Sequence, residues 1–167
     1  KLANLRIFES SSSDARFRGM GTTVVGGLFA NGTIYIGHVG DSRAYRLRGG
    51  ALEQLTEDHS LLNDYIRANK LTPEEIEAFP HKNVIVRALG MKESVQVDVS
   101  RLEPMANDIY LLCSDGLSGP VSDPEIQEIL ATNTADIGEA ASALIARANE
   151  NGGPDNITAV VVRVTES

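Results

Sequence analysis

Two glycine-containing turns define the first part of this chain as a series of short antiparallel strands. Asn31-Gly32 separates residues 22–29 from residues 33–39, and both flanking segments are rich in β-branched residues. Asn-Gly is a strong signal for a two-residue hairpin because both positions of such a turn need a positive φ. Gly49-Gly50 marks a second turn, ahead of residues 52–55. We therefore expect an antiparallel meander between residues 22 and 55.

The rest of the chain alternates helical and strand patterns. Apolar residues at helical spacing predict a helix over 2–9, which the serines at 10–13 are expected to end in a loop. Capping boxes that begin at Thr72 and Ser122 predict two further helix starts. Helices are also expected at 60–69 and 136–149, and strands at 84–89, 95–99, 109–113 and 157–164. This pattern predicts an α+β fold of two packed antiparallel sheets flanked by helices.

Length and composition limit the class of protein. The 167 residues suffice for one domain, and no linker is apparent. The formal net charge of −8 does not favour binding to nucleic acid or anionic membranes. No apolar run approaches the ~20 residues of a membrane span. The single cysteine, Cys113, lies in an apolar run and is expected to be a buried thiol, so we expect a cytoplasmic protein.

Three aspartates at strand ends are candidates for metal binding. Asp41, Asp115 and Asp155 each lie beside a glycine or a Gly-Gly-Pro turn. Such carboxylates repel one another unless a hard divalent cation neutralises them. Each aspartate alone is better explained as a turn or capping residue, because Asp-Gly and Gly-Pro-Asp are ordinary turn sequences. Spacing and periodicity therefore leave the function open.

Six motifs in order give the chain a specific resemblance. It resembles the bacterial members of the metal-dependent type 2C protein serine/threonine phosphatase family, and the likeness runs through nearly all of its length. The motifs that carry this resemblance are Gly19-Met20-Gly21-Thr22-Thr23, Gly40-Asp41-Ser42-Arg43, Leu55-Thr56-Glu57-Asp58-His59-Ser60, Arg87-Ala88-Leu89-Gly90, Leu112-Cys113-Ser114-Asp115-Gly116-Leu117 and Gly152-Gly153-Pro154-Asp155-Asn156-Ile157-Thr158.

The resemblance implies an α-β-β-α sandwich with a binuclear Mn²⁺ or Mg²⁺ centre. Asp115 and Asp155 match ligands of one metal ion, and Asp41 matches the carboxylate that holds a weaker third ion in bacterial members. Asn83 falls near a position that can also touch this ion. The implied reaction is hydrolysis of phosphoserine and phosphothreonine in proteins, by attack of a water that bridges the metals. No nucleophilic side chain is expected, and the implied substrates are phosphoproteins made by a bacterial Ser/Thr kinase.

The resemblance also assigns a flap and leaves the histidines outside catalysis. Residues 60–80, including Leu61, Leu62, Tyr65 and Ile66, match a helical flap that controls substrate access. The alternative is a helical hairpin that merely covers a sheet edge. For His38 and His59 we expect packing or capping roles, and we assign the role of general acid to neither of them nor to His81.

The family's first third, with its Asp-Gly-Met-Gly-Gly motif, has no counterpart here. We therefore expect the chain to be part of a longer domain and, alone, to bind metal weakly, hydrolyse phosphate poorly and self-associate through exposed sheet surface. Two alternatives remain at this point. One is a non-catalytic interaction or regulatory domain on the same fold, and the other is a structural domain stabilised by Ca²⁺ or Mg²⁺.

Overall fold

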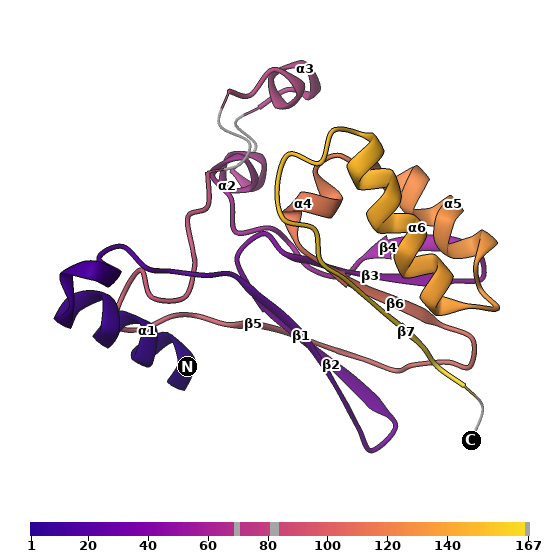
Figure 1. The fold of residues 1–167 in the computed structure, drawn as a ribbon, viewed down its shortest axis with the longest axis horizontal. Helices are drawn as coiled ribbons and strands as arrows, with labels where there is room; N and C mark the ends of the chain where they lie inside the picture. Colours follow the sequence, from indigo (N-terminus) through magenta and orange to yellow (C-terminus); the bar gives the residue numbers. More distant parts are fainter. Residues whose placement is uncertain (69–70, 81–83, 166–167) are drawn as a thin grey trace. The chain divides into compact units, whose positions relative to one another are not determined.

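The computed structural model describes residues 1–68, 71–80 and 84–165. No helix in this part of the chain is both long and apolar enough to cross a bilayer. The elements, labelled in Figure 1 apart from η1, are α1 (Leu2–Ser13), η1 (Ala15–Phe17), β1 (Val24–Ala30), β2 (Thr33–Val39), β3 (Arg43–Arg48), β4 (Ala51–Gln54), α2 (Leu61–Arg67), α3 (Pro73–Glu77), β5 (Asp98–Leu102), β6 (Ile109–Cys113), α4 (Asp115–Ser118), α5 (Asp123–Thr132), α6 (Ile137–Glu150) and β7 (Ala159–Arg163).

Contacts divide the chain into two compact units. The first unit comprises Lys1–Val24, Gly37–Asp41 and Glu57–Asp98, and it contains α1 and the two helices of the predicted flap. The second unit comprises Val25–Ile36, Ser42–Thr56 and Val99–Ser167. Strands β1, β2 and β5 each cross from one unit to the other.

The described strands form two antiparallel sheets. One sheet has the strand order β4-β3-β6-β7, and the other has the order β1-β2-β5. In the first of these sheets Tyr45 pairs with Leu111, and Leu111 pairs with Val161. The prediction of two antiparallel sheets with helices beside them is confirmed.

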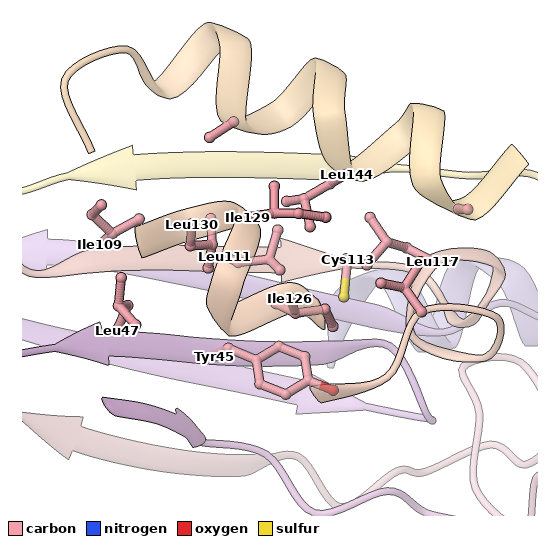
Figure 2. Packing of buried hydrophobic residues seen from close by; sticks show 13 residues of the cluster. Tyr45, Leu47, Ile109, Leu111, Cys113, Leu117, Ile126, Ile129, Leu130 and Leu144 are labelled. Atoms are coloured by element: carbon pink, nitrogen blue, oxygen red, sulfur yellow. The ribbon is translucent and has the colours of Figure 1, made fainter. Parts of the chain in front are cut away.

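Alternate residues of the central strands pack on opposite faces of their sheet, as the two-residue period of a strand requires. Leu111 and Cys113 on β6 point toward α5 and α6, where they meet Ile126 and Leu144 (Figure 2). Tyr110, the residue before Leu111, packs on the other face against Ile34 and Ile36 of β2 together with Ala44 of β3. Burial of a Leu or Ile side chain contributes about 1.5–3 kcal/mol, so both faces stabilise the fold. The expectation that Cys113 is a buried thiol is confirmed.

Capping residues fix the beginnings of the helices of the second unit. Ser122 and Glu125 form the predicted capping box of α5, in which the Ser122 N–H donates to Glu125 Oε2 at 3.0 Å. Asp136 accepts the N–H groups of Gly138 and Glu139 at the start of α6. Arg147 of α6 then donates to Glu125 Oε1 at 2.8 Å, which links the two helices.

Three expectations about element boundaries were wrong. Helix α1 continues through the serines at 10–13, and Asp14 ends it while its side chain accepts the Arg16 N–H. Residues 84–89 form no strand; they contribute only isolated bridges, from Ile85 to Ser60 and from Leu89 to Thr22. The strand expected at 95–99 begins at Asp98 instead. For the two strand segments, the backbone partners available in the fold override the local pattern.

The expected meander also does not exist as one sheet. Strands β2 and β3 belong to different sheets, and the chain changes sheet at Gly40, whose φ is 111°. A side chain at this position would be strained, and its Cβ would lie 2.3 Å from Thr23 Cγ2. The turn at Gly40 therefore ends a two-stranded hairpin, and β3 and β4 form a separate hairpin.

In the first unit, α1 is tied to the segment after residue 89 by one buried side chain. Asn4 donates to the carbonyl oxygens of Lys92 and Glu93 at 3.0 and 2.9 Å, and it accepts the Gly90 N–H at 2.9 Å. The helix approaches Gly90 closely, because a Cβ there would lie 2.4 Å from Ile7 Cγ2. These contacts hold α1 against residues 90–93.

Candidate functional site

Two of the predicted acidic residues lie on loops whose main chains touch. Asp115 begins α4, one residue after the end of β6, and Asp155 precedes β7, the antiparallel neighbour of β6. Gly116 shows how close the two loops are, because a Cβ at this position would lie 2.3 Å from the Asn156 carbonyl oxygen and 3.3 Å from the Asp155 carbonyl carbon. The structure therefore brings the Asp115 and Asp155 loops together, as the sequence predicted.

Ser114 joins the two loops by hydrogen bonds. Its hydroxyl donates to the Asn156 carbonyl oxygen at 3.1 Å and accepts the Thr158 N–H at 3.0 Å. Its own N–H donates to the Thr158 carbonyl oxygen at 3.2 Å. All of these contacts bind main chain, which agrees with a turn role for Ser114 rather than a nucleophilic one.

The carboxylates of this pair suit a hard divalent cation. Oδ1 of Asp115 accepts the Gly116 N–H at 3.0 Å, and Oδ1 of Asp155 accepts the Asn156 N–H at 2.7 Å. Each of these bonds engages one oxygen of a carboxylate that has two. Both residues are exposed, and Mg²⁺ or Mn²⁺ prefers oxygen ligands and keeps several of its waters. The two residues therefore fit the implied metal ion.

Asp41 lies in the first unit, in the turn between β2 and β3. His59 holds this turn through both main-chain groups of Gly40: Nδ1 of His59 accepts the Gly40 N–H at 3.0 Å, and the His59 N–H donates to the Gly40 carbonyl oxygen at 3.0 Å. The backbone that presents Asp41 is therefore fixed from one side by a single buried histidine.

The half-buried Asp98 and Arg87 complete a hydrogen-bond network around the buried His59. Asp98 lies 3.2 Å from His59 Nε2 and accepts from Arg87 NH1 at 2.8 Å. Burial lowers the pKa of His59, the charge of Arg87 lowers it further, and the hydrogen bond with Asp98 opposes this shift. Burial alone would raise the pKa of Asp98, but its bonds with His59 and Arg87 lower it. These shifts favour a neutral imidazole beside an ionised carboxylate.

His38, His59 and Asp98 also have the spacing of a metal site, since one ligand atom from each lies within 4.8 Å of the others. Their existing contacts argue against a cation there. Both ring nitrogens of His59 already have partners, and Nε2 of His38 donates to the Glu57 carbonyl oxygen at 2.9 Å. Arg87 NH1 lies 2.9 Å from His59 Nε2, so its positive charge would repel a divalent ion. We interpret the group as a closed hydrogen-bond network.

The flap begins at this network. Ser60 caps α2 by accepting the Asn63 N–H at 3.2 Å, and Arg67 pairs with Glu57 at 2.6 Å. Tyr65 of α2 packs against Phe79, which follows α3, with ring centroids 5.5 Å apart. The helical structure expected for this segment is confirmed over α2 and α3, while its role in substrate access stays a prediction. Among the flap residues named from the sequence, Tyr65 and Ile66 are exposed, and Leu61 and Leu62 are half-buried.

Two backbone hydrogen bonds hold the two ends of the flap side by side. Leu61 donates to the Val84 carbonyl oxygen at 2.8 Å, and Val86 donates to the His59 carbonyl oxygen at 2.9 Å. The segment therefore leaves and rejoins the first unit at nearly the same place. Asn83 and His81 lie outside the described residues, so the assignment of Asn83 to a third metal ion stays a prediction.

The family model described as protein phosphatase 2C matches residues 3–153. The chain belongs to this family. A protein phosphatase 2C relative, serine/threonine phosphatase stp of Listeria monocytogenes, is 41% identical over 159 residues, which are 95% of this chain and 63% of the relative. PhpP of Streptococcus pneumoniae is 40% identical over 99% of this chain and 67% of its own length. The chain thus spans less than two thirds of the Listeria protein.

Solved structures of the protein phosphatase 2C family share the fold. The serine/threonine phosphatase PstP/Ppp of Mycobacterium tuberculosis matches with a TM-score of 0.90 and 40% identity, over 98% of this chain and 68% of that one. A structure of the catalytic domain of PstP in complex with two manganese ions matches with a TM-score of 0.86 and 40% identity, over 98% of this chain and 67% of that one.

The network around His59 was not predicted from the sequence. A packing or capping role was expected for this residue, and the structure shows it capping the Gly40 turn. Asp98 and Arg87 lie 39 and 28 residues from it in sequence, and no local pattern connects the three. His59 and Arg87 each lie in one of the six family motifs, whereas Asp98 lies in none of them.

Proposed function

We propose that this chain is part of a metal-dependent protein phosphatase that hydrolyses phosphoserine and phosphothreonine in proteins. The observation that supports this proposal is the close main-chain approach of Gly116 to Asn156, in the loops beside the neighbouring strands β6 and β7 that carry Asp115 and Asp155. In this proposal Asp115 and Asp155 ligate one Mn²⁺ or Mg²⁺ ion. Asp41, with Asn83, contributes to a further and weaker site. Membership of the family and the manganese-bound relative support this assignment.

The chain's own residues would hold the cations rather than form a covalent intermediate. When bound, two or three such ions supply a nucleophilic water at neutral pH and neutralise charge on the phosphoryl oxygens. The Ser114 hydrogen bonds and the Gly116 contact keep Asp115 and Asp155 in register. No described side chain is needed as a nucleophile, since Ser114 binds main chain and Cys113 is buried in the core.

We propose phosphorylated proteins as substrates, made by a bacterial Ser/Thr kinase, with the exposed Tyr65 and Ile66 of the flap beside the entering peptide. The serine/threonine phosphatases among the relatives support this substrate class. We further propose a cytoplasmic location, which agrees with a single, buried cysteine and hence no internal disulfide.

The test is a Mn²⁺ titration of phosphopeptide hydrolysis by the full-length protein that contains this chain. Loss of an outer-shell partner already costs about 10–100-fold at metal sites. We therefore expect Asp115→Asn and Asp155→Asn each to lower turnover by about a hundredfold or more. The matched control is Asp136→Asn at the start of α6, because asparagine is an equally good helix cap. Unchanged turnover in both ligand variants would contradict the proposal. Tight Mn²⁺ binding without hydrolysis would favour a non-catalytic domain.

We also propose that the 167-residue chain alone associates with a second copy through the sheet that contains β1. Strand β1 is an edge strand, and its Leu28 and Phe29 side chains are 63% and 45% exposed. An exposed apolar edge is a template for pairing with another chain. Light scattering of the isolated chain should give a mass above 17.9 kDa, and Leu28→Lys should shift it toward that value. A monomeric unsubstituted chain at high concentration would rule this out.

A further inference from the structure

The position of the Asp41 turn depends on contacts to the preceding residue, Gly40. On one side Thr23 packs so closely that any Cβ at residue 40 would overlap it. On the other side His59 binds both the N–H and the carbonyl oxygen of Gly40, each at 3.0 Å. The backbone that leads into Asp41 is therefore set by one steric contact and two hydrogen bonds.

These contacts determine which nitrogen of the His59 ring carries the proton. A backbone N–H can only donate, so Nδ1, which receives the Gly40 N–H, must be unprotonated. The neutral ring then carries its proton on Nε2 and donates it to Asp98 Oδ2. Arg87 can also only donate, so its contact with Nε2 is not a hydrogen bond; its proper acceptor is Asp98 Oδ1, at 2.8 Å.

The ring itself is held on every side that the structure describes. It is 3% exposed and stacks on His38 with centroids 4.6 Å apart. The backbone of His59 accepts the Val86 N–H, which ties it to the base of the flap. The Nδ1 acceptor therefore has little freedom to follow the Gly40 turn if that turn moves.

We propose that His59 is a positioning residue, which fixes the Asp41 turn through Nδ1 and thereby sets the affinity of the cation that Asp41 binds. This inference rests on the proposed role of Asp41 as a metal ligand. His59 does not touch the cation or the substrate; it acts through the Gly40 N–H. Asp98 and Arg87 orient the ring, in the way that outer-shell partners orient metal ligands elsewhere.

Two conservative variants test separately the hydrogen bond of Nδ1 with Gly40 and that of Nε2 with Asp98. In His59→Asn the Oδ1 atom occupies a place equivalent to Nδ1, so it can still accept the Gly40 N–H but cannot reach Asp98. In His59→Gln the longer amide can reach Asp98 but cannot accept from Gly40. His59→Leu loses both bonds. Mn²⁺ binding to the full-length protein, measured by calorimetry, should weaken about tenfold or more at the weaker site for the Gln and Leu variants. The Asn variant should stay close to the unsubstituted protein.

A second measurement does not depend on any variant. Nitrogen-15 NMR of the unsubstituted protein should show a neutral His59 ring protonated at Nε2, and a proton on Nδ1 would overturn the proposal. Equal Mn²⁺ affinity of the Leu variant and the unsubstituted protein would overturn it as well.

Asp41→Asn in the same calorimetric titration distinguishes the ligand role of Asp41 from the positioning role of His59. If this change weakens the weaker Mn²⁺ site while His59→Leu does not, only the positioning role fails. If Asp41→Asn leaves Mn²⁺ binding unchanged, the assignment of Asp41 as a ligand fails and the positioning role fails with it.

Discussion

At the scale of single residues, the absence of a side chain at Gly116 is as important as the carboxylates around it. The helix that begins at Asp115 passes so close to residues 155 and 156 that only a hydrogen atom fits between them. Any larger residue must push the two loops apart. The separation of the Asp115 and Asp155 carboxylates is thus controlled by the residue next to one of them.

We expect Gly116→Ala to weaken Mn²⁺ binding and to destabilise the fold by about 1–3 kcal/mol, as overpacking typically does. The new Cβ would lie 2.3 Å from a carbonyl oxygen of the backbone, which cannot rotate away. Urea unfolding and Mn²⁺ calorimetry on the full-length protein measure the two effects. Gly26→Ala is the control, because a Cβ on Gly26 meets nothing within 4 Å. Equal Mn²⁺ affinity for both variants would show that the loop contact does not control the site.

These residues also show which features of the candidate site could be predicted from the sequence alone. The places of Asp115 and Asp155 in the fold were predictable because each lies in a turn signal, Asp115 after a strand with an apolar pattern and Asp155 before one. The roles of Gly116 and His59 were not, because each depends on an atom 19 or more residues away: Asn156 for Gly116, and Gly40 for His59. Local patterns report turns and strands, while contacts between distant loops appear only once the chain is folded.

At the scale of elements, predictions succeeded where local signals were complete. Helices α5 and α6 begin where their capping residues are, and β6 was predicted at Ile109–Cys113, where apolar residues are continuous. The strand predicted at residues 84–89 does not form, because this β-branched segment makes only isolated bridges to Ser60 and Thr22. The single meander was predicted wrongly for a similar reason. A turn signal does not indicate which strand the next strand will pair with, so the change of sheet at Gly40 could not be predicted.

The capping box of α5 should make stability depend on pH. Hydrogen bonds from the Ser122 backbone and hydroxyl, followed by Arg147, lower the pKa of Glu125 from 4.5 to about 2. The ionised form is therefore favoured in the folded state, so its stabilising effect is complete above pH 4.5 and is lost as the pH falls toward 2. The difference in unfolding free energy between the unsubstituted protein and Glu125→Gln should be largest near neutral pH and should shrink on acidification. A difference that stays constant with pH would contradict this.

At the scale of the whole molecule, the second unit has its own core. The cluster between α5, α6 and the sheet of β3 and β6 contains Leu144, which is fully buried, while its neighbour Ile145 is 36% exposed. This contrast on one helix follows from the 3.6-residue period, which turns successive residues toward and away from the sheet.

We expect Leu144→Ala to lower the free energy of unfolding by about 2–5 kcal/mol, because it removes buried atoms and leaves a cavity. Ile145→Ala on the same helix is the matched control and should cost clearly less. Urea unfolding followed by circular dichroism measures both. Similar losses for the two variants would mean that α6 does not pack as described.

The hydrogen bonds that join the two ends of the flap affect how freely the flap sequence can vary within the family. Because the Leu61–Val84 and His59–Val86 hydrogen bonds close the base of this segment, the intervening residues form an insert whose ends are already joined. Lengthening a closed loop costs little, since the entropy of closure grows only with the logarithm of its length. A graft of foreign sequence between residues 61 and 84 would therefore leave the backbone around Gly40 undisturbed. If this segment governs substrate access as proposed, substrate preference could change within it while Asp115, Asp155 and the Gly40 turn stay the same.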